Sequence, residues 1–282
     1  MPEHPLNTIL EERIGGKIIN SVPLSGGGIN RVLKIETSKG IYVLKTNNSP
    51  VALNMFKAEK KGLDELNKSN TFRIPKILEV GIEGDHAFLV MEYIASQQKS
   101  ANYDIEFGRL LAKMHQTTAD KFGFDSNNFI GSLAQYNGKR RLASQFYIEM
   151  RLEPQLKLAT IKGFKFNTGR LFLNIADLIP EEPPALVHGD LWSGNAIPDS
   201  KGLPALIDPA VFYGQRETDI AMMLLFGGFS NRIIESYQES FPLAPGWEQR
   251  LDLWQLYYLL AHLNLFGSAY YNGVERIIKK YS

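Results

Sequence analysis

Residues 186–229 read LVHGDLWSGNAIPDSKGLPALIDPAVFYGQRETDIAMMLLFGGF, and this stretch decides the fold that we expect for the chain. Asp190 is followed five residues later by Asn195, and a further acid, Asp208, comes thirteen residues after this amide. Two apolar residues precede His188 and three precede Asp208, which predicts a short buried strand before each acid. The stretch therefore predicts a cleft into which two acids and an amide open.

The order of these polar groups is typical of a kinase catalytic loop, in which an acid precedes an amide by five residues. Transfer of a γ-phosphoryl group requires a carboxylate that orients the acceptor hydroxyl and takes its proton. Asp190 is the candidate for this catalytic role. The triphosphate of ATP also needs Mg²⁺, which prefers carboxylate or amide oxygens together with phosphate and water. Asn195 and Asp208 are the candidate metal ligands.

Each acid also has a plainer interpretation. Aspartate is common in turns for local hydrogen-bonding reasons, and Asp190 and Asp208 lie beside Gly189 and Pro209. Either acid alone would favour a turn residue. The four polar residues His188, Asp190, Asn195 and Asp208 together, with apolar segments before both acids, favour the phosphoryl-transfer site.

The N-terminal segment predicts strands around a glycine-rich turn. A short helix is expected over residues 7–13, followed by strands over residues 17–24 and 31–37. The turn between these strands contains Gly26, Gly27 and Gly28, which would let backbone amides lie close to phosphate oxygens. The pattern is neither a Walker loop nor a Rossmann fingerprint, because both need a strand followed directly by a helix. A flexible hairpin is the plainer interpretation.

A lysine and a glutamate are predicted to meet behind this turn. Residues 41–45 are expected to form a strand whose alternation puts Lys45 on the same face as two aliphatic side chains. Ser49 and Pro50 are expected to begin a helix that runs to about Lys68. Glu59 falls within the apolar stripe of that helix, so it needs a buried partner.

The pairing of Lys45 with Glu59 is the kinase arrangement that grips the α- and β-phosphates. Two alternatives stay open. Lys45 at a strand end could extend to solvent, and Glu59 could face solvent beside Lys60 and Lys61.

The remaining pattern changes from strand to helix. Strands over residues 73–80 and 86–91 complete a five-stranded sheet by about Tyr93, which divides the chain into an N-terminal lobe, 1–93, and a C-terminal lobe, 94–282. Residues 122–132 are too rich in Asn and Gly for regular structure and are expected to form an ordered substrate wall. Helices are expected over residues 103–118, 143–160, 170–178, 218–225 and 248–265.

Composition excludes several classes of protein. The chain has 282 residues, 44% hydrophobic residues and a formal net charge of +1, which gives no general electrostatic reason to bind nucleic acid or an anionic membrane. It contains no cysteine, so disulfides and thiol catalysis are excluded. The N-terminal residues lack the basic start and apolar run of a signal peptide. We expect a cytoplasmic protein without a membrane span, present as a monomer or a weak homodimer.

Several segments together resemble the fructosamine kinase (ketosamine 3-kinase) family, within the larger group of aminoglycoside phosphotransferases and choline kinases. The resemblance covers nearly the whole chain. It is carried by HGDLWSGN (188–195), IDPA (207–210), YGQRETDIAM (213–222), LFGGF (225–229), NFIGSLAQYN (128–137) and RLEPQL (151–156). The first motif alone indicates only the broad kinase-like group. Trp192 and the NFIGS and FGGF segments are more specific.

The resemblance implies an α+β, protein-kinase-like fold with two lobes, a small antiparallel-sheet lobe with one main helix and a larger, mainly helical lobe. It implies ATP-dependent phosphorylation of the C3 hydroxyl of a ketosamine, free or attached to a protein, and release of the amine by elimination. By position, Asp190 is then the base, Asn195 and Asp208 hold Mg²⁺, and Lys45 with Glu59 clamps phosphate. Met91, Glu92 and Tyr93 match the adenine-binding hinge, Asp219 matches an acid that braces the catalytic loop, and the candidate substrate residues are Trp192, Asn128, Phe129 and Tyr213.

One position departs from the family pattern. Gln215 stands where the family commonly has His, so a proton-transfer role there is in doubt. Two rival functions predict different sequence features. A kinase for an amino alcohol or an aminoglycoside would favour an acidic cleft, and the likely substrate segments show no acidic cluster. A nucleotide-binding module without catalysis would have lost at least one of Lys45, Asp190, Asn195 and Asp208.

Overall fold

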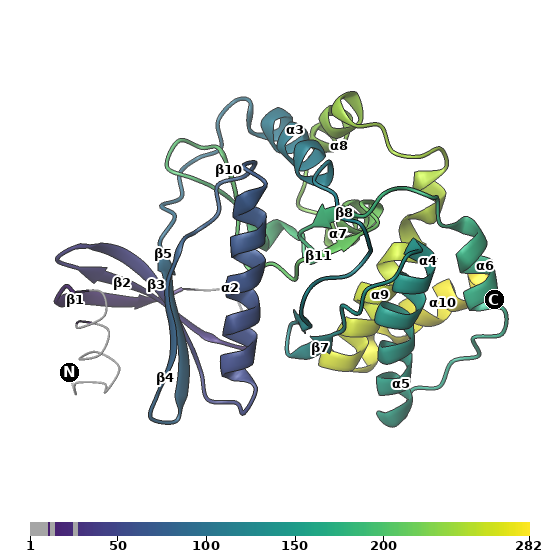
Figure 1. The fold of residues 1–282 in the computed structure, drawn as a ribbon, viewed down its shortest axis with the longest axis horizontal. Helices are drawn as coiled ribbons and strands as arrows, with labels where there is room; N and C mark the ends of the chain where they lie inside the picture. Colours follow the sequence, from purple (N-terminus) through teal and green to yellow (C-terminus); the bar gives the residue numbers. More distant parts are fainter. Residues whose placement is uncertain (1–10, 12–14, 25–27) are drawn as a thin grey trace.

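The computed structural model describes residue 11 and residues 15–24 and 28–282. A five-stranded antiparallel sheet forms the N-terminal lobe, in the order β1-β2-β3-β5-β4 (Figure 1). Its strands are β1 (Ile18–Pro23), β2 (Arg31–Thr37), β3 (Gly40–Asn47), β4 (Ile77–Glu83) and β5 (His86–Glu92). The helix expected over residues 7–13 and the glycines Gly26 and Gly27 lie outside the described residues.

Helix α2 (Ala52–Lys68) packs on one face of this sheet. Alternation in β5 points Ala87, Leu89 and Met91 towards α2, where Ala52 and Phe56 join them in an apolar cluster. Phe88 and Val90 point to the opposite face and pack with residues of β2 and β3. The period of two in the strands thus gives the lobe two small cores.

The expected start of α2 was wrong. The helix begins at Ala52 with Val51 as its N-cap residue, and no side chain caps it. Ser49 and Pro50 form a turn in which the Ser49 carbonyl accepts a hydrogen bond from the Ala52 amide. Because the chain has just left strand β3, the backbone turns once before the helix can form.

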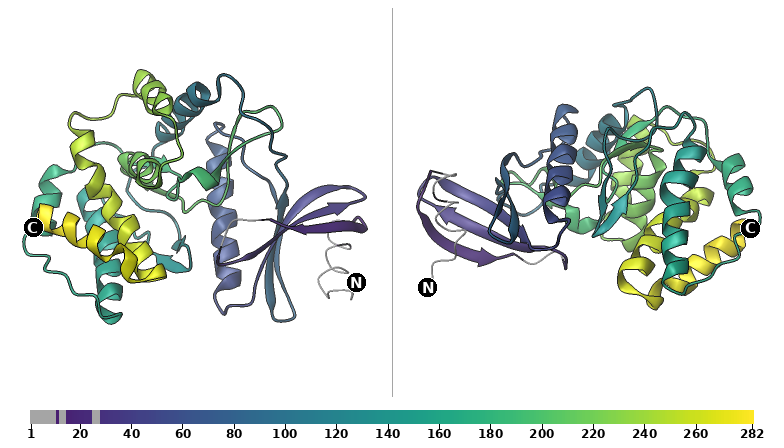
Figure 2. Two further views of the ribbon diagram at one scale, coloured as in Figure 1. Left: turned by 180° about the vertical axis from the view of Figure 1, so that it is seen from behind. Right: turned by 60° about the horizontal axis from the view of Figure 1, so that its bottom comes forward.

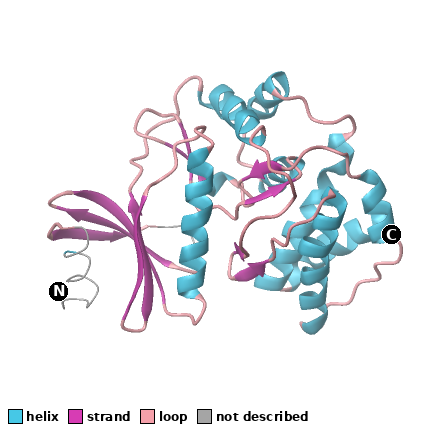
Figure 3. Ribbon diagram, viewed as in Figure 1, coloured by secondary structure: helices cyan, strands magenta, loops and turns pink. Residues whose placement is uncertain are grey.

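After Glu92 the chain is mainly helical (Figure 3). The expected helix over residues 143–160 is interrupted by a π-helical turn, Ile148–Leu152. Two short antiparallel ladders pair β8 (Ala185–Val187) with β11 (Phe212–Gly214) and β9 (Ala196–Pro198) with β10 (Pro204–Leu206). The helices are α3 (Tyr103–His115), α4 (Ala143–Tyr147), α5 (Glu153–Ile161), α6 (Leu171–Leu178), α7 (Glu217–Phe226), α8 (Asn231–Ser240), α9 (Trp247–Phe266) and α10 (Tyr271–Tyr281).

Three features of the fold were not predicted. Helices α8 and α10 fell in segments for which no element was expected. The turn-rich passage 122–132 contains the regular strand β6 (Asn128–Ile130), which pairs with β7 (Leu133–Gln135) directly after it, so its description as irregular was wrong. Strand β4 begins only at Ile77, because Pro75 interrupts the segment that was expected to be strand from Arg73.

Helix α2 lies between the sheet and the helical lobe, as the views in Figure 2 show. Gly62 on α2 permits close contact, since a Cβ there would lie 3.3 Å from side-chain atoms of Pro209 and Val211. One turn further along, Glu65 accepts a hydrogen bond of 2.9 Å from the Tyr213 hydroxyl. The helix is therefore fixed to both lobes. Within the described part of the chain, no helix has the length and apolarity needed to cross a bilayer.

Candidate active site

A cleft of about 430 Å³ lies between the lobes, within the usual size range of small-molecule sites. It collects residues from segments far apart in the sequence. Eleven of the fifteen residues predicted for the site line it, namely Lys45, Glu59, Met91, Glu92, Tyr93, Asn128, Phe129, Asp190, Trp192, Asn195 and Asp208. Of the four others, Gly28 and Tyr213 do not line it, and Gly26 and Gly27 lie outside the described residues.

The loop that carries Asp190 follows strand β8 (Ala185–Val187) and ends at β9 (Ala196–Pro198). Gly189, with φ of +81°, makes the turn before Asp190. A Cβ at Gly189 would lie 2.2 Å from the Ala210 carbonyl oxygen, so only glycine fits. The Asn195 side chain closes the loop by donating to the Asp190 carbonyl at 2.9 Å and to its carboxylate at 3.3 Å.

Asp208 follows strand β10 (Pro204–Leu206), as the apolar run before it predicted. Its φ of +52° is a left-handed conformation that aspartate tolerates better than most residues. The Asn195 amide group also reaches the Asp208 carbonyl, at 3.3 Å. One side chain therefore connects the two acid-bearing segments.

Lys45 lies where the strand and helix patterns placed it. Its ammonium donates to Glu59 at 2.7 Å and also contacts the Asp208 carboxylate. Burial alone would lower the pKa of the Lys45 ammonium, but the charges of Asp208 and Glu59 raise that pKa above its usual value. The lysine is therefore charged and held between one acid from each lobe, rather than extended to solvent.

Asp190 has the electrostatic setting of a group that exchanges protons near neutral pH. Burial, and then the nearby charge of Asp208, raise the pKa of the Asp190 carboxyl to about 7, while the hydrogen bond from Asn195 opposes this rise. A carboxylate with such a pKa is a stronger base than an exposed aspartate. It still gives a large ionised fraction at neutral pH.

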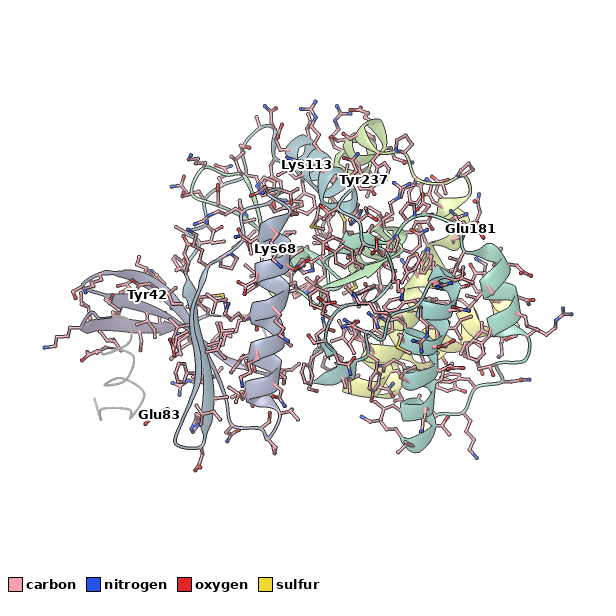
Figure 4. The ribbon with its side chains drawn as sticks, viewed as in Figure 1. Tyr42, Lys68, Glu83, Lys113, Glu181 and Tyr237 are labelled. Carbon is pink, nitrogen blue, oxygen red and sulfur yellow. The ribbon has the colours of Figure 1, made fainter. Side chains whose placement is uncertain are left out.

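Asp219, on α7, supports the backbone of the loop that carries Asp190. Its carboxylate accepts hydrogen bonds from the backbone amides of His188 at 2.7 Å and Gly189 at 2.9 Å. His115 reaches the same carboxylate at 3.2 Å and contacts the Tyr237 hydroxyl at 2.9 Å. Tyr237, which Figure 4 labels, belongs to α8 and links that helix to His115 of α3. His115 therefore supports the loop through Asp219.

The other end of the cleft is apolar and suits a flat base. Val32 and Val43 line it together with Met91. The carboxylate of Glu92 is engaged by Arg73, and its backbone amide donates to the Lys76 carbonyl at 2.8 Å. Residues 29 and 30 of the glycine-rich turn are tied to β3 by Asn47, whose amide donates to the Ile29 carbonyl at 3.1 Å and to the Asn30 side chain at 2.8 Å. Asn47 was not singled out from the sequence.

The four candidate substrate residues have different surroundings. Trp192 is 40% exposed and lies over Gly194, where a Cβ would collide with its ring. Phe129 is half-buried at the cleft. The Asn128 amide oxygen accepts two internal hydrogen bonds and its amino group donates to Val211, so this side chain is occupied by the protein itself. Tyr213 points away to Glu65 on α2.

The oxygens of Asn195 and Asp208 form a donor set that suits Mg²⁺. One amide and one carboxylate from adjoining loops face a cleft, and Mg²⁺ bound with a nucleotide commonly takes only one or two such protein ligands. Among the described residues no group of three His, Cys, Asp or Glu side chains could hold a metal by itself. The set therefore fits an ion that phosphate oxygens help to bind.

Comparison with known proteins agrees with this geometry. The sequence model of the family described as "Fructosamine kinase" matches residues 4–282. The chain belongs to the fructosamine kinase family. A relative in Enterococcus faecium, named as a probable ketoamine kinase, is 39% identical over 98% of this chain and 99% of its own length. Ketosamine-3-kinase of Mus musculus is 32% identical, with 98% and 100% covered, and the chloroplastic protein-ribulosamine 3-kinase of Arabidopsis thaliana is 36% identical, with 100% and 88% covered.

Solved structures confirm the predicted kinase-like fold. A Haemophilus somnus protein that carries a fructosamine-3-kinase name superimposes with a TM-score of 0.89 at 27% identity, over 98% of this chain and 96% of that one. The aminoglycoside phosphotransferase APH(4)-Ia reaches 0.59 at 16% identity, with 97% of this chain and 98% of that one covered. This second likeness shows the shared fold alone.

Gln215, the departure from the family pattern, lies away from the cleft. It is buried at the start of α7, where its side-chain oxygen accepts the Glu217 amide at 3.4 Å and its amino group donates to the Pro180 carbonyl at 3.4 Å. It lines a separate cavity of about 10 Å³. The Gln215 side chain therefore bonds to the protein itself. The assignment of Asp190 as the candidate base does not depend on Gln215.

Proposed function

We propose that this chain transfers the γ-phosphoryl group of ATP to the C3 hydroxyl of a ketosamine. The observation that carries the proposal is the meeting of Asp190 with the Lys45, Glu59 and Asp208 cluster in one cleft of a chain that belongs to the fructosamine kinase family. The names of the mouse and Arabidopsis relatives, ketosamine-3-kinase and protein-ribulosamine 3-kinase, favour a fructose- or ribose-derived ketosamine.

In this reaction Asp190 accepts the proton of the acceptor hydroxyl as its oxygen bonds to the γ-phosphorus. The bond between that phosphorus and the β,γ-bridging oxygen breaks, and ADP leaves. Because burial raises the pKa of Asp190 to about 7, its carboxylate is basic enough to hold the proton late in the transfer. Lys45, kept charged by Glu59 and Asp208, is placed to bind phosphate oxygens.

Asn195 and Asp208 would hold Mg²⁺, which neutralises phosphate charge when it is bound. The apolar end of the cleft near Val43 and Met91 is suited to adenine. Trp192 and Phe129 are the proposed contacts for the sugar or its amine. The brace of Asp219 on the backbone of the loop fixes the direction in which Asp190 points.

The product explains why this reaction reverses glycation. Its phosphate lies on C3, next to the C2 ketone, so loss of a C1 proton gives an enol that expels the phosphate, and hydrolysis of the resulting C1 imine releases the amine. Since the sequence has no cysteine, a reducing compartment is compatible with the chain, and we propose the cytoplasm.

The test is a substrate comparison with purified protein and Mg-ATP. Fructosyl-lysine, ribulosyl-lysine, choline and an aminoglycoside are offered separately, ADP release is measured, and phosphorus–proton NMR locates the phosphate. We expect turnover with one or both ketosamines and phosphate on C3. The D190N variant is the matched blank. Turnover of choline or the aminoglycoside, with none of either ketosamine, would contradict the proposal.

A further inference from the structure

Arg151 is a buried arginine in the π-helical turn Ile148–Leu152, between α4 and α5. It is 1% exposed, and its guanidinium carbon lies 4.1 Å from the ring centre of Phe212 and 4.6 Å from that of Phe146. Among the residues that the structure describes, no carboxylate forms an ion pair with it. π-Helical turns often occur at functional sites.

Stability alone does not explain a cation in this place. Burial lowers the pKa of the Arg151 guanidinium to about 10, which reflects the unfavourable free energy of desolvating its charge. Its Nε has no hydrogen-bond partner among the described residues, and the side chain borders the cavity of about 10 Å³ described above. An apolar side chain of similar length would fill the aromatic pocket without this desolvation.

The guanidinium is connected to the active site through side-chain amides. It donates to the Asn137 side-chain oxygen at 2.8 Å and to the carbonyl of Tyr136. Asn137 donates in turn to the Asn128 side-chain oxygen at 2.8 Å. Gln135 donates to the same oxygen at 2.8 Å and to the Ala210 carbonyl at 2.9 Å. These bonds tie the β6–β7 hairpin to the backbone just after Asp208.

The hairpin forms one wall of the cleft. Phe129 and Gly131 line the cleft, and a Cβ at Gly131 would lie 2.9 Å from Leu265 and 3.2 Å from Ile29 of the glycine-rich turn. A small displacement of the hairpin would therefore change the distance between this wall and the other lobe. The Asn128 amide group also donates to the Val211 carbonyl at 2.8 Å, which couples the wall to the chain beyond Asp208.

We propose that Arg151 is a positioning residue that holds the β6–β7 hairpin, and with it the acceptor-side wall of the cleft, through Asn137 and Asn128. It touches neither substrate nor nucleotide. Its forked donors bind two acceptors directly after β7 at once, while the aromatic rings hold its plane. The kinetic part of its test rests on the proposed function, and a second part does not.

The first test replaces Arg151 with methionine, which keeps the length of the side chain and removes its donors. We expect a melting temperature within a few degrees of wild type, a ketosamine KM at least tenfold higher, and an unchanged calorimetric affinity for a non-hydrolysable ATP analogue. Amide hydrogen exchange should accelerate over residues 128–137 and stay unchanged in the sheet. Arg140→Met is the matched control, because the half-buried Arg140 also binds the same turn, through Glu149, but makes no bond to Asn137 or Asn128. It should leave every measurement at the wild-type value.

A second variant guards against poor folding of the first. Asn137→Ala leaves Arg151 in its aromatic pocket and removes the link to Asn128, so it should reproduce the higher ketosamine KM and the faster exchange. Wild-type KM and exchange in Arg151→Met would overturn the proposal. If Arg151→Met does not fold, the same result in Asn137→Ala would overturn it. Should no ketosamine react with the wild-type protein, the proposed function fails, and hydrogen exchange still decides the role of Arg151.

Discussion

Replacing Asp190 with asparagine should abolish phosphoryl transfer and stabilise the free protein. The amide keeps the shape of the side chain and can still accept the hydrogen bond from Asn195, but it carries no charge and cannot take a proton. Removal of a general base lowers turnover by about 10²–10⁴-fold. We therefore expect turnover to fall at least ~100-fold.

The stability effect follows from the pKa of Asp190. A pKa raised from 3.8 to about 7 corresponds to ~4 kcal/mol that opposes ionisation in the folded protein. Because the carboxylate lines an open cleft, solvent reduces this penalty, and we expect Asp190→Asn to gain about 1–3 kcal/mol at pH 8. The folded pKa lies above the unfolded one, so the penalty is present at high pH and is lost as the pH falls through 7 towards 4. The gain should shrink in the same direction.

Urea unfolding of the magnesium- and nucleotide-free protein at pH 6.0 and pH 8.0 measures this difference. Asp125→Asn is the control, because Asp125 is an exposed aspartate whose side chain is 91% accessible. Its free energy of unfolding should change by less than ~0.5 kcal/mol at both pH values. If Asp190→Asn were no more stable than wild type at pH 8, or turned over at a wild-type rate, the assignment of a strained catalytic base would be refuted.

Three further substitutions test the rest of the site. Lys45→Met should lower turnover by about 10²–10³-fold, because it removes a fixed donor for phosphate oxygens and leaves Glu59 and Asp208 without their cation. Steady-state kinetics measures this change, and wild-type kinetics would show that Lys45 forms only a structural ion pair. Asp208→Ala should weaken Mg-ATP binding at least ~10-fold in calorimetry while adenosine binds unchanged, and equal Mg-ATP affinity would remove it from the ligand set. Asp219→Asn should lower the free energy of unfolding in urea by about 1–3 kcal/mol and also lower turnover, because one backbone amide of the loop then faces an amino group. An unaffected variant would show that these two hydrogen bonds are not needed to hold the loop.

The segments of the candidate site could be predicted because their signals are local. A strand period of two placed Lys45 on the cleft face, and a helical stripe placed Glu59 opposite it. The apolar residues before Asp208 predicted its strand. Ser230, which caps α8 by accepting the Arg232 amide, gave an equally local signal that was overlooked.

Other features depend on contacts between distant segments. The β6–β7 hairpin contains Asn and Gly that favour irregular structure, and it is fixed by bonds from Asn128 and Gln135 to backbone carbonyls some 75 to 83 positions away. The sequence does not distinguish a Tyr213 side chain that faces a substrate from one that faces Glu65. Only the position of α2 in the fold decides between the two. The buried place of Arg151 could not be inferred either, because an isolated arginine predicts an exposed residue.

The contact of Gly62 with Pro209 and Val211 limits how the cleft can open to admit nucleotide. A swing of α2 away from the helical lobe would break this packing together with the bond from Tyr213 to Glu65. Among the described residues, strands β1 and β2 form no hydrogen bond or ion pair with the helical lobe, whereas β3 is held there by the contact of Lys45 with Asp208. Strands β1 and β2 are therefore the part that can lift. Nucleotide entry would then displace these strands, while α2 stays packed against the helical lobe. Because Glu59 lies on α2, its position would not change during the catalytic cycle.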